Sequence, residues 1–280
     1  MQSLVIQWGT SLSRPFNVTN GVHQGGILSP RLFNIFINDL SVALSNVPYG
    51  CHVSDECFNH VSYADDSVLL ATSPTALQYL IDFCLEYFST HILLINVKKT
   101  KRVSILPKAL KDLYIPSFFI YGNVLSCVTK ECYLGVFMTS SDDDDEAIQK
   151  EIRALYARGN MLIRNFRQCT DDVKKQLFMS FCSSFYCTSL WTVYKRASLQ
   201  ALHVAHNNVL RLLFHLPRIG SISGHFVSQG IPNFLVLRRK LIYSMYKRVL
   251  SSQNTLIYTL ANVNHFMYTR IYKEWVDTLF

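Results

Sequence analysis

Charged residues are scarce in this sequence of 280 amino acids. Only 16% of the residues are Asp, Glu, Lys or Arg, whereas 49% are apolar. This balance excludes an intrinsically disordered chain, which combines high charge with low hydrophobicity. The N-terminus also lacks the basic start and long apolar run of a signal peptide. We therefore expect an ordered globular protein with one large domain or two modest ones.

Cysteine pairs and membrane spans are missing as well. The eight cysteines form no Cys-x-x-Cys pair and have no His at zinc-ligand spacing, which favours buried thiols over a zinc site or a disulfide framework. Residues 176–194 are 19 residues without a charge, about the length of a membrane span. This stretch is rich in Ser, Thr and Cys, so we predict a buried helix of a globular domain and no membrane partner.

Acidic residues are absent from residues 1–38, and charge is unevenly divided along the chain. Residues 1–145 contain 9 basic and 13 acidic residues, a net charge of −4, whereas residues 146–280 contain 18 and 6, a net charge of +12. The basic half could bind a nucleic acid, because such affinity comes mainly from neutralised phosphates. Solvated helix faces would explain the same charge equally well.

Two Ser-Pro pairs predict the starts of helices. In Ser29-Pro30 and Ser73-Pro74, a hydroxyl that can cap a helix precedes a proline at the first helical position. Apolar residues follow each pair with a 3.6-residue period, which predicts two amphipathic helices. Their apolar faces contain Leu32, Phe33, Phe36, Ile37 and Leu40 in the first helix, and Leu77, Leu80, Ile81, Cys84 and Tyr87 in the second.

Short strand-like runs alternate with these helices. Residues 61–64 and 67–71 flank Asp65-Asp66, and Asp tolerates turn conformations, so we predict a hairpin with both carboxylates at its tip. Further strands are expected at 92–97, 102–106, 117–121, 124–128 and 133–138. The alternation predicts an α+β fold with an antiparallel sheet and packed helices.

The pattern becomes helical after residue 140. The run from Asp142 to Asp145 is expected to be a solvated linker, because four adjacent carboxylates would make a crowded and flexible metal site. Helices are predicted beyond it at 146–167, 171–194, 196–215 and 232–251. The chain is therefore divided into residues 1–140, residues 141–255 and a tail, 256–280, to which the sequence assigns no role.

Asp65 and Asp66 are the strongest candidates for chemistry. Two like charges about 4 Å apart repel by about 4 kcal/mol at an effective dielectric constant near 20, and a divalent cation would neutralise them. Mg²⁺ is commonly held by one or two carboxylates together with phosphates and water. That arrangement suits phosphoryl transfer with two metal ions. Taken alone, however, an Asp pair is more often a polar turn.

The sequence around this pair resembles the reverse transcriptase family. The similar segments, in chain order, are a loop and helix at 21–40, the signature Tyr63-Ala64-Asp65-Asp66, the motif Asn96-Val97-Lys98-Lys99-Thr100, and the primer-grip strand Tyr133-Leu134-Gly135. Residues 177–191, 206–211 and 216–218 look like the thumb and downstream region of non-LTR retrotransposons of the LINE type, similar to jockey elements. Four motifs in the family's order make a specific signal.

This resemblance implies a partial reverse-transcriptase palm over residues 1–140 and a helical thumb over 141–255. It implies an RNA-directed DNA polymerase in the nucleus or cytoplasm that uses an RNA template, a DNA primer, dNTPs and Mg²⁺ or Mn²⁺. Asp65 and Asp66 would hold the metal, and Lys99 would stabilise charge on, or give a proton to, the leaving pyrophosphate. Substrate binding would fall to Gln24, Gly25, Gly26, Ser29, Pro30, Tyr63 and Asn96, and the primer grip to Tyr133, Leu134 and Gly135.

The family also uses an Asp on the first palm strand, well upstream of the position of Gln24. Because residues 1–38 contain no acidic residue, we expect an N-terminally truncated polymerase that is weak or inactive alone, since small misplacements can lower rates about a hundredfold. One alternative is a retrotransposon remnant that only binds RNA or an RNA–DNA hybrid through its basic half. Another is a fragment that cannot fold, because a missing palm strand would expose a sheet edge.

Overall fold

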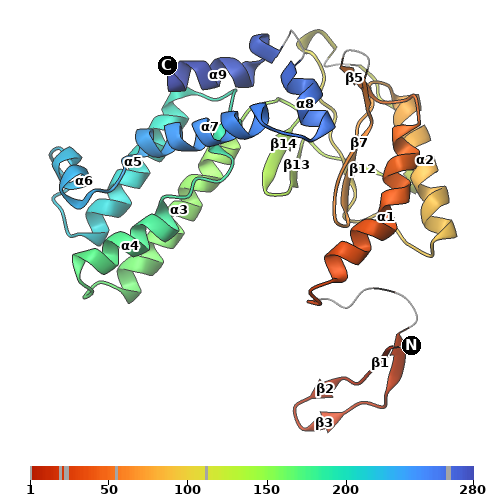
Figure 1. Cartoon of the computed structure of the whole chain (residues 1–280), viewed down its shortest axis with the longest axis horizontal. Helices are drawn as coiled ribbons and strands as arrows, with labels where there is room; N and C mark the ends of the chain where they lie inside the picture. Colours follow the sequence, from red (N-terminus) through yellow and green to blue (C-terminus); the bar gives the residue numbers. More distant parts are fainter. Residues whose placement is uncertain (1, 19–20, 22–24, 54–55, 111–112, 263–265) are drawn as a thin grey trace. The chain divides into compact units, whose positions relative to one another are not determined.

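A computed structural model describes residues 2–18, 21, 25–53, 56–110, 113–262 and 266–280. The chain divides into two compact units (Figure 1). Unit 1 comprises Met1–Ile95 and Phe118–Gly122, and unit 2 comprises Asn96–Ser117 and Asn123–Phe280. Paired strands and helices alternate in unit 1 and helices dominate unit 2, which confirms the predicted α+β class. The division near residue 140 stays a prediction.

Unit 1 combines two long helices with short antiparallel strand pairs. The helices are α1 (Ser29–Ser45) and α2 (Pro74–Thr90). The strand pairs are β1 (Gln2–Leu4) with β4 (Phe16–Val18), β2 (Gln7–Trp8) with β3 (Ser11–Leu12), β5 (Cys51–Val53) with β6 (Glu56–Phe58), and β7 (His60–Tyr63) with β8 (Asp66–Leu69). Strand β10 (Phe119–Ile120) packs beside α2. Within the described residues, each ladder of unit 1 joins two strands.

The two predicted helix starts differ in the structure. Ser73 caps α2 as predicted, because its hydroxyl oxygen accepts a hydrogen bond from the backbone N–H of Ala76 at 3.2 Å. Ser29 is itself the first residue of α1, and Leu28 occupies the cap position. The capping role predicted for Ser29 is therefore wrong. Prolines at the start of both helices remain consistent with their fixed φ.

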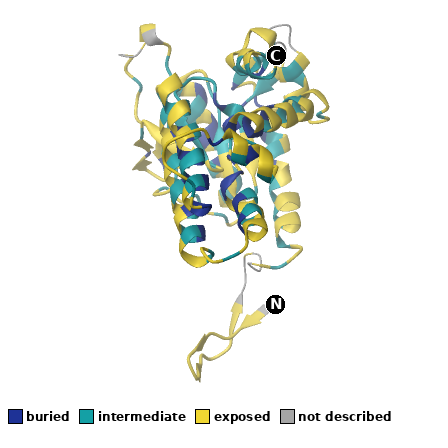
Figure 2. Ribbon diagram, turned by 90° about the vertical axis from the view of Figure 1, so that its left-hand side faces the viewer, coloured by how far each residue is buried: buried dark blue, intermediate teal, exposed yellow. Residues whose placement is uncertain are grey.

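The core of unit 1 lies where the C-terminal half of α1 meets α2. Leu40, Leu44 and Val47 pack there against Leu80 and Cys84. The N-terminal half of the predicted apolar face of α1 stays outside this core, since its Leu and Phe side chains at 32 and 36 are exposed. Residues 3–17, which contain most of β1 to β4, are also exposed (Figure 2).

Unit 2 is built mainly of helices. They are α3 (Asp145–Asn165), α4 (Asp171–Cys182), α5 (Arg196–Leu213), α6 (Ser223–Gln229), α7 (Phe234–Leu250), α8 (Thr255–Asn262) and α9 (Arg270–Leu279), with the short 3-10 helices η1 (Lys108–Leu110), η2 (Thr188–Leu190) and η3 (Phe266–Tyr268). Strand β13 (Lys130–Tyr133) pairs antiparallel with β14 (Val136–Thr139), and β9 (Lys101–Arg102) pairs parallel with β12 (Ser126–Cys127). Strand β11 (Asn123–Val124) precedes β12. No helix in the described part of the chain is both long and apolar enough to cross a membrane.

The core of unit 2 forms around the contact of α3 with α5. Leu155 and Leu162 of α3, Leu202 and Leu210 of α5, and Phe178 of α4 are fully buried in it. The buried faces of these helices point inward in Figure 2. The helices predicted from the 3.6-residue periodicity thus pack around a core of their own.

Several predicted elements differ from the structure, and of the strand predicted at 102–106 only residue 102 lies in a strand. The helix predicted at 171–194 ends at Cys182, because the next residues leave the helix to pack Phe185 into the core. The strand predicted at 133–138 is instead the turn and second strand of a hairpin. Residues 92–97 contain no strand. For the end of α4 and for the turn at residues 134–135, contacts between distant segments accompany a conformation that the local sequence left ambiguous.

The acidic run is not the solvated linker that the sequence suggested. The carboxylate of Asp144 accepts hydrogen bonds from the backbone N–H groups of Thr192 and Val193 at 2.7 and 2.9 Å. Asp145 begins α3, and its carboxylate accepts from the N–H of Lys195 at 2.9 Å. Burial raises the pKa of Asp144, although the two backbone donors oppose that shift. The run therefore anchors the segment before α5 to the start of α3.

The cysteines differ in their surroundings. All eight are free thiols; Cys84 and Cys182 are buried, whereas Cys127 and Cys132 are exposed and the others lie between. Burial raises the pKa of Cys84 to about 12 and that of Cys182 to about 11. The prediction of buried thiols is therefore right for these two and wrong for the exposed pair.

His206 lies at the centre of the unit 2 core. Its ring is fully buried and stacks on Phe226, with ring centroids 5.9 Å apart, while Phe178 lies 5.1 Å away. Neither ring nitrogen has a hydrogen-bond partner among the described residues. Burial, with a smaller effect from the nearby His203, lowers the pKa of His206 to about 3. The side chain is therefore neutral in the folded protein near pH 7.

This buried histidine should make the stability of unit 2 depend on pH. Because its pKa is about 3 when folded and about 6.5 when unfolded, the unfolded chain alone takes up a proton between these values. The free energy of unfolding should fall by about 1.4 kcal/mol per pH unit below pH 6.5 from this group. Urea titrations between pH 4 and 8 should show a shallower dependence for His206→Phe. The control His215→Asn, which removes an exposed histidine, should show the same pH dependence as the parent. If the free energy of unfolding changed equally with pH in the parent and in both variants, His206 would not be the source of the pH dependence.

Candidate functional site

The two predicted carboxylates lie at the turn of the β7–β8 hairpin. The register pairs His60 with Leu69 and Tyr63 with Asp66, which leaves Ala64 and Asp65 as the two-residue turn. Ala64 has a positive φ of 52°, which is uncommon for a residue other than glycine. Asp65 and Asp66 are both exposed. The predicted hairpin with both carboxylates at its tip is confirmed.

Three polar side chains hold the base of this hairpin to α1. The amide nitrogen of Asn59 donates to the carbonyl oxygens of Leu44 and Val47 at 2.6 and 3.3 Å, at the C-terminal end of α1. Its amide oxygen lies 2.8 Å from Nδ1 of His60, and Nε2 of His60 lies 2.5 Å from the hydroxyl of Ser41. Asn59 is 2% exposed, so this chain of hydrogen bonds, the Asn59–His60–Ser41 chain, is sheltered from water at its Asn59 end.

The chain of bonds determines the state of the histidine. Because the Asn59 amide nitrogen already donates to α1, its oxygen must accept from Nδ1–H of His60. In the neutral ring the proton is therefore on Nδ1, and Nε2 accepts from the Ser41 hydroxyl. Burial lowers the pKa of His60 and favours the same neutral form. These residues were missed from the sequence; a polar Asn-His pair directly before a strand was the available signal.

The loop before α1 contains the other candidates of unit 1. Gly25 has φ +87°, a conformation that side chains rarely adopt, and an added Cβ would meet no atom within 4 Å. The carbonyl of Gly26 accepts a hydrogen bond from the N–H of Ser29 at 3.2 Å and so begins the turn into α1. Pro30 is exposed on the first turn, and Tyr63 is exposed beside the carboxylates. Gln24 lies outside the described residues.

Asn96 and Lys99 lie together in unit 2. The side-chain oxygen of Asn96 accepts from the N–H of Lys99 at 3.2 Å, and its backbone oxygen accepts from the N–H groups of Lys99 and Thr100 at 3.0 and 2.9 Å. Asn96 therefore shapes the turn that presents Lys99, whose side chain is exposed. Asp65 and Asp66 belong to unit 1, so the structure describes the two halves of the predicted site separately.

Tyr133, Leu134 and Gly135 form the end of β13 and the turn of the β13–β14 hairpin. Tyr133 pairs with Val136, and Leu134 and Gly135 have positive φ angles of 48° and 83°. The predicted primer-grip strand is thus a tight turn flanked by two strands.

The donor groups available for a metal are the two hairpin carboxylates. Among the residues that the structure describes, no three His, Cys, Asp or Glu side chains gather into a metal-ligand group. Carboxylate oxygens are nevertheless the ligands that Mg²⁺ prefers, and one or two of them suffice when phosphates and water complete the shell. Asp65 and Asp66 therefore fit a cation held jointly with a phosphate-bearing substrate.

The basic residues of α3 differ in their contacts with the rest of unit 2. Arg158 forms an ion pair with Glu151, and Lys150 lies over the Phe137 ring with Nζ 4.5 Å from its centroid. Arg153 and Arg164 are exposed, as is Lys150, but the two arginines form no ion pair or ring contact among the described residues. They are 11 residues apart, about three helical turns, and so lie on one face of α3. This face is the part of α3 that can offer cations to an external anion.

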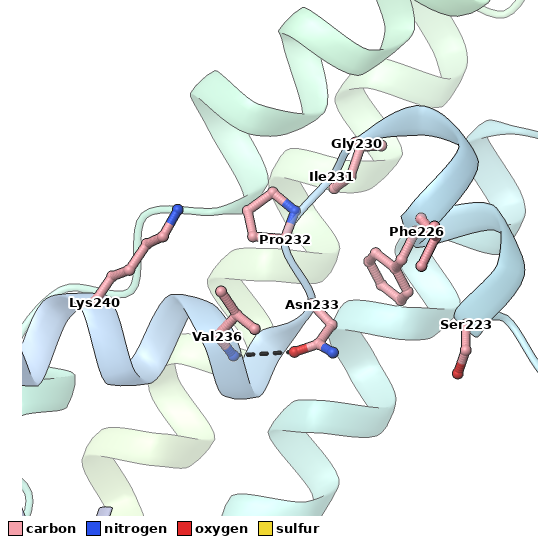
Figure 3. A pocket seen from close by; sticks show the side chains of 9 residues that line it. Ser223, Phe226, Gly230, Ile231, Pro232, Asn233, Val236 and Lys240 are labelled. Atoms are coloured by element: carbon pink, nitrogen blue, oxygen red, sulfur yellow. Dashed lines mark hydrogen bonds between the residues drawn. The ribbon is translucent and has the colours of Figure 1, made fainter. Parts of the chain in front are cut away.

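A shallow groove of unit 2 lies between α6 and α7 (Figure 3). Phe226, Ile231, Pro232 and Val236 line it, with Lys240 at its edge. The side chain of Asn233 accepts a hydrogen bond from the N–H of Val236 at 3.0 Å and so caps α7. With mostly apolar walls and no carboxylate, this groove offers no reaction chemistry.

Comparison with known proteins identifies similar sequences. Residues 2–153 match the family described as "Reverse transcriptase (RNA-dependent DNA polymerase)". The chain is 37% identical over 145 residues to the Retrovirus-related Pol polyprotein from type-2 retrotransposable element R2DM of Drosophila melanogaster, covering 48% of this chain and 14% of that protein. It is 26% identical over 208 residues to the RNA-directed DNA polymerase from mobile element jockey of Drosophila funebris, covering 70% and 22%. The matched segments thus span less than a quarter of these relatives.

Removal of Asn59 should loosen the base of the carboxylate hairpin. Asn59→Ala takes the side-chain donor from two carbonyls and the acceptor from His60, and we expect it to lower the free energy of unfolding by about 2 kcal/mol. Hydrogen exchange of β7 and β8 should accelerate accordingly. Ser62→Ala is the control, because it removes only an exposed hydroxyl 3.0 Å from that of Ser67. Similar losses in both variants would show that the Asn59–His60–Ser41 chain does not secure the hairpin.

Proposed function

This chain belongs to the reverse transcriptase (RNA-dependent DNA polymerase) family, and we propose that it supplies the catalytic hairpin and thumb of a LINE-type RNA-directed DNA polymerase. The similarity to R2 and jockey elements places its relatives among LINE-type retrotransposons. The proposal rests above all on one observation: Asp65 and Asp66 are exposed at a hairpin turn whose base is fixed to α1. Its RNA template and DNA primer would be met in the nucleus or cytoplasm.

The carboxylate pair is proposed to hold the divalent cation on which the family depends. A bound Mg²⁺, or Mn²⁺, supplies charge neutralisation at the transferring phosphoryl group. Asp65 and Asp66 provide hard oxygen ligands and are relieved of their mutual repulsion by the cation. An exposed turn leaves room for the phosphates of a dNTP beside them, and Tyr63 would flank the bound nucleotide.

The remaining candidates are proposed to position the substrates. Gly25 lets the loop before α1 approach a nucleotide or template closely, and Gly26 follows it. Ser29 and Pro30, at the start of α1, and Gln24 are proposed to bind the substrate as well. Asn96 sets the turn that presents Lys99, whose ammonium group would stabilise the leaving pyrophosphate. The turn at Tyr133, Leu134 and Gly135 would support the primer end. Unit 2 would follow the backbone of the RNA–DNA hybrid, which proteins recognise by shape.

Polymerase activity of this chain alone is proposed to be weak. Two carboxylates are available at the hairpin, and the described residues contain no third acidic, His or Cys group beside them. A cation held by two carboxylates is positioned less firmly than one held by three protein ligands. A displacement of reacting groups by about 1 Å can lower the rate of the chemical step about a hundredfold.

Primer extension tests the catalytic part of this proposal. With an RNA template, a DNA primer, dNTPs and Mg²⁺ or Mn²⁺, we expect extension about a hundredfold slower than by a complete enzyme of the family. Asp65→Asn should abolish what remains, whereas the exposed acid Asp277 can be changed to Asn as a control without effect. Extension that persists in Asp65→Asn would refute the catalytic role, and vigorous extension that this variant loses would refute only the claim of weakness.

The basic charge of residues 146–280 favours a second function, which is binding of nucleic acid without catalysis. Its support is the net charge of +12 over residues 146–280 together with the exposed cations on one face of α3. A retrotransposon remnant could retain this property after losing the reaction. Binding would then persist when Asp65 and Asp66 are replaced and when divalent metal is removed.

Salt dependence of binding tests the α3 face in either function. The affinity for an RNA–DNA hybrid should fall as salt rises, and Arg153→Ala/Arg164→Ala should lower the slope of log K against log salt by roughly 1.5, because each lost phosphate contact contributes about 0.7 to 0.9. The double variant Lys240→Ala/Lys273→Ala removes two exposed cations from α7 and α9 and should leave the slope unchanged. Equal changes in both double variants would exclude α3 as the contact face.

A further inference from the structure

The segment after α4 connects the helical core with the β13–β14 hairpin. Phe185 is 3% exposed and packs against His206 and Phe234, with ring centroids 5.5 and 5.1 Å apart. The next residue, Tyr186, is 62% exposed. Cys187 follows with φ +62°, a left-handed conformation that costs about 1–3 kcal/mol in a non-glycine residue. The backbone is thus forced to change direction immediately after a firmly buried ring.

Tyr186 contacts the turn of the hairpin directly. Its phenolic O–H donates a hydrogen bond to the carbonyl oxygen of Leu134 at 2.8 Å. Its ring covers Gly135 so closely that a Cβ at that position would lie 2.8 Å from the Tyr186 ring. Glycine at 135 therefore serves two purposes, since it tolerates φ +83° and leaves space for the ring.

The base of the same hairpin is held separately by α3. Lys130 of β13 forms an ion pair with Glu146, and Lys150 lies over the Phe137 ring of β14. The ion pair of Lys130 holds the end of the hairpin that lies away from its turn, whereas Phe137 lies one residue pair from Tyr133 and Val136, which close the turn. Leu134, with φ +48°, is a strained residue in the turn itself. Tyr186 supplies a hydrogen bond and a ring contact at this strained end.

We propose that Tyr186 is a positioning residue that fixes the turn of the β13–β14 hairpin for the primer end. It acts through the backbone of Leu134 and Gly135 and not by touching the reacting atoms. This inference rests on the proposed function, in which that turn supports the primer. The buried ring of Phe185 fixes the backbone next to Tyr186, and the left-handed conformation of Cys187 turns the chain directly after it. The hydrogen bond from the tyrosine hydroxyl then sets the distance between Tyr186 and the turn.

Tyr186→Phe tests this role because it removes the hydroxyl and keeps the ring. Hydrogen exchange of residues 133–136 should become about threefold to tenfold faster, as expected for one lost hydrogen bond. The preference of the chain for a primed RNA template over the same RNA without primer should fall by a similar factor. Tyr186→Ala should produce larger changes. Tyr258→Phe, at a tyrosine of α8 that is 60% exposed, is the matched control and should change neither measurement.

The measurements separate failure of this inference from failure of the proposed function. If the parent chain prefers primed template and Tyr186→Phe retains that preference, the positioning role is refuted while the function stands. If Tyr186→Phe weakens binding of primed and unprimed RNA equally, its role is structural only and the inference is also refuted. If the parent chain shows no preference for primed template, the primer-grip function falls and the inference falls with it, whatever the exchange rates.

Discussion

Helix α3 can lie against α5 as closely as it does only because residue 159 has no side chain. A Cβ on Gly159 would be 2.5 Å from Cγ1 of Val209, well inside the limit for real atoms. The other parts of unit 2 depend on this contact because α3 also carries their attachments. Asp144 and Asp145 at its start hold residues 192–195, and its next turns hold the base of the β13–β14 hairpin. Packing at one small residue thus sets the frame for strands and loops that have little core of their own.

The two hairpins with candidate roles follow the same construction. Each has a two-residue turn that begins with a non-glycine residue at positive φ, Ala64 in one and Leu134 in the other. Each is secured to a neighbouring helix by its own side chains, through Asn59 and His60 to α1 or through Lys130 and Phe137 to α3. A tip that must meet charged substrate cannot be buried, so its position has to come from contacts elsewhere along the strands.

Local signals in the sequence predicted some of this structure well. The Ser73-Pro74 start, the carboxylate hairpin and the first helix of the basic half each depend on residues adjacent in the chain, whose conformational preferences act locally. The end of α4 and the turn at Leu134-Gly135 could not be predicted in this way. Both depend on tertiary contacts, since Phe185 enters the core and Tyr186 reaches the turn. Likewise, the Asn59–His60–Ser41 chain could not be predicted, because its residues come together only when β7 packs beside α1.

The docking of α9 determines where a recombinant fragment can end. Trp275 is 1% exposed and donates from Nε1 to the carbonyl of Ser189 at 2.7 Å, while Glu274 pairs with the buried guanidinium of Arg238. Removing one partner of a buried ion pair typically costs about 3–5 kcal/mol, a large share of a domain's stability. A fragment that stopped before residue 270 would also leave an indole-sized gap in unit 2. The folded unit therefore includes α9, far beyond residue 153, where the family match ends.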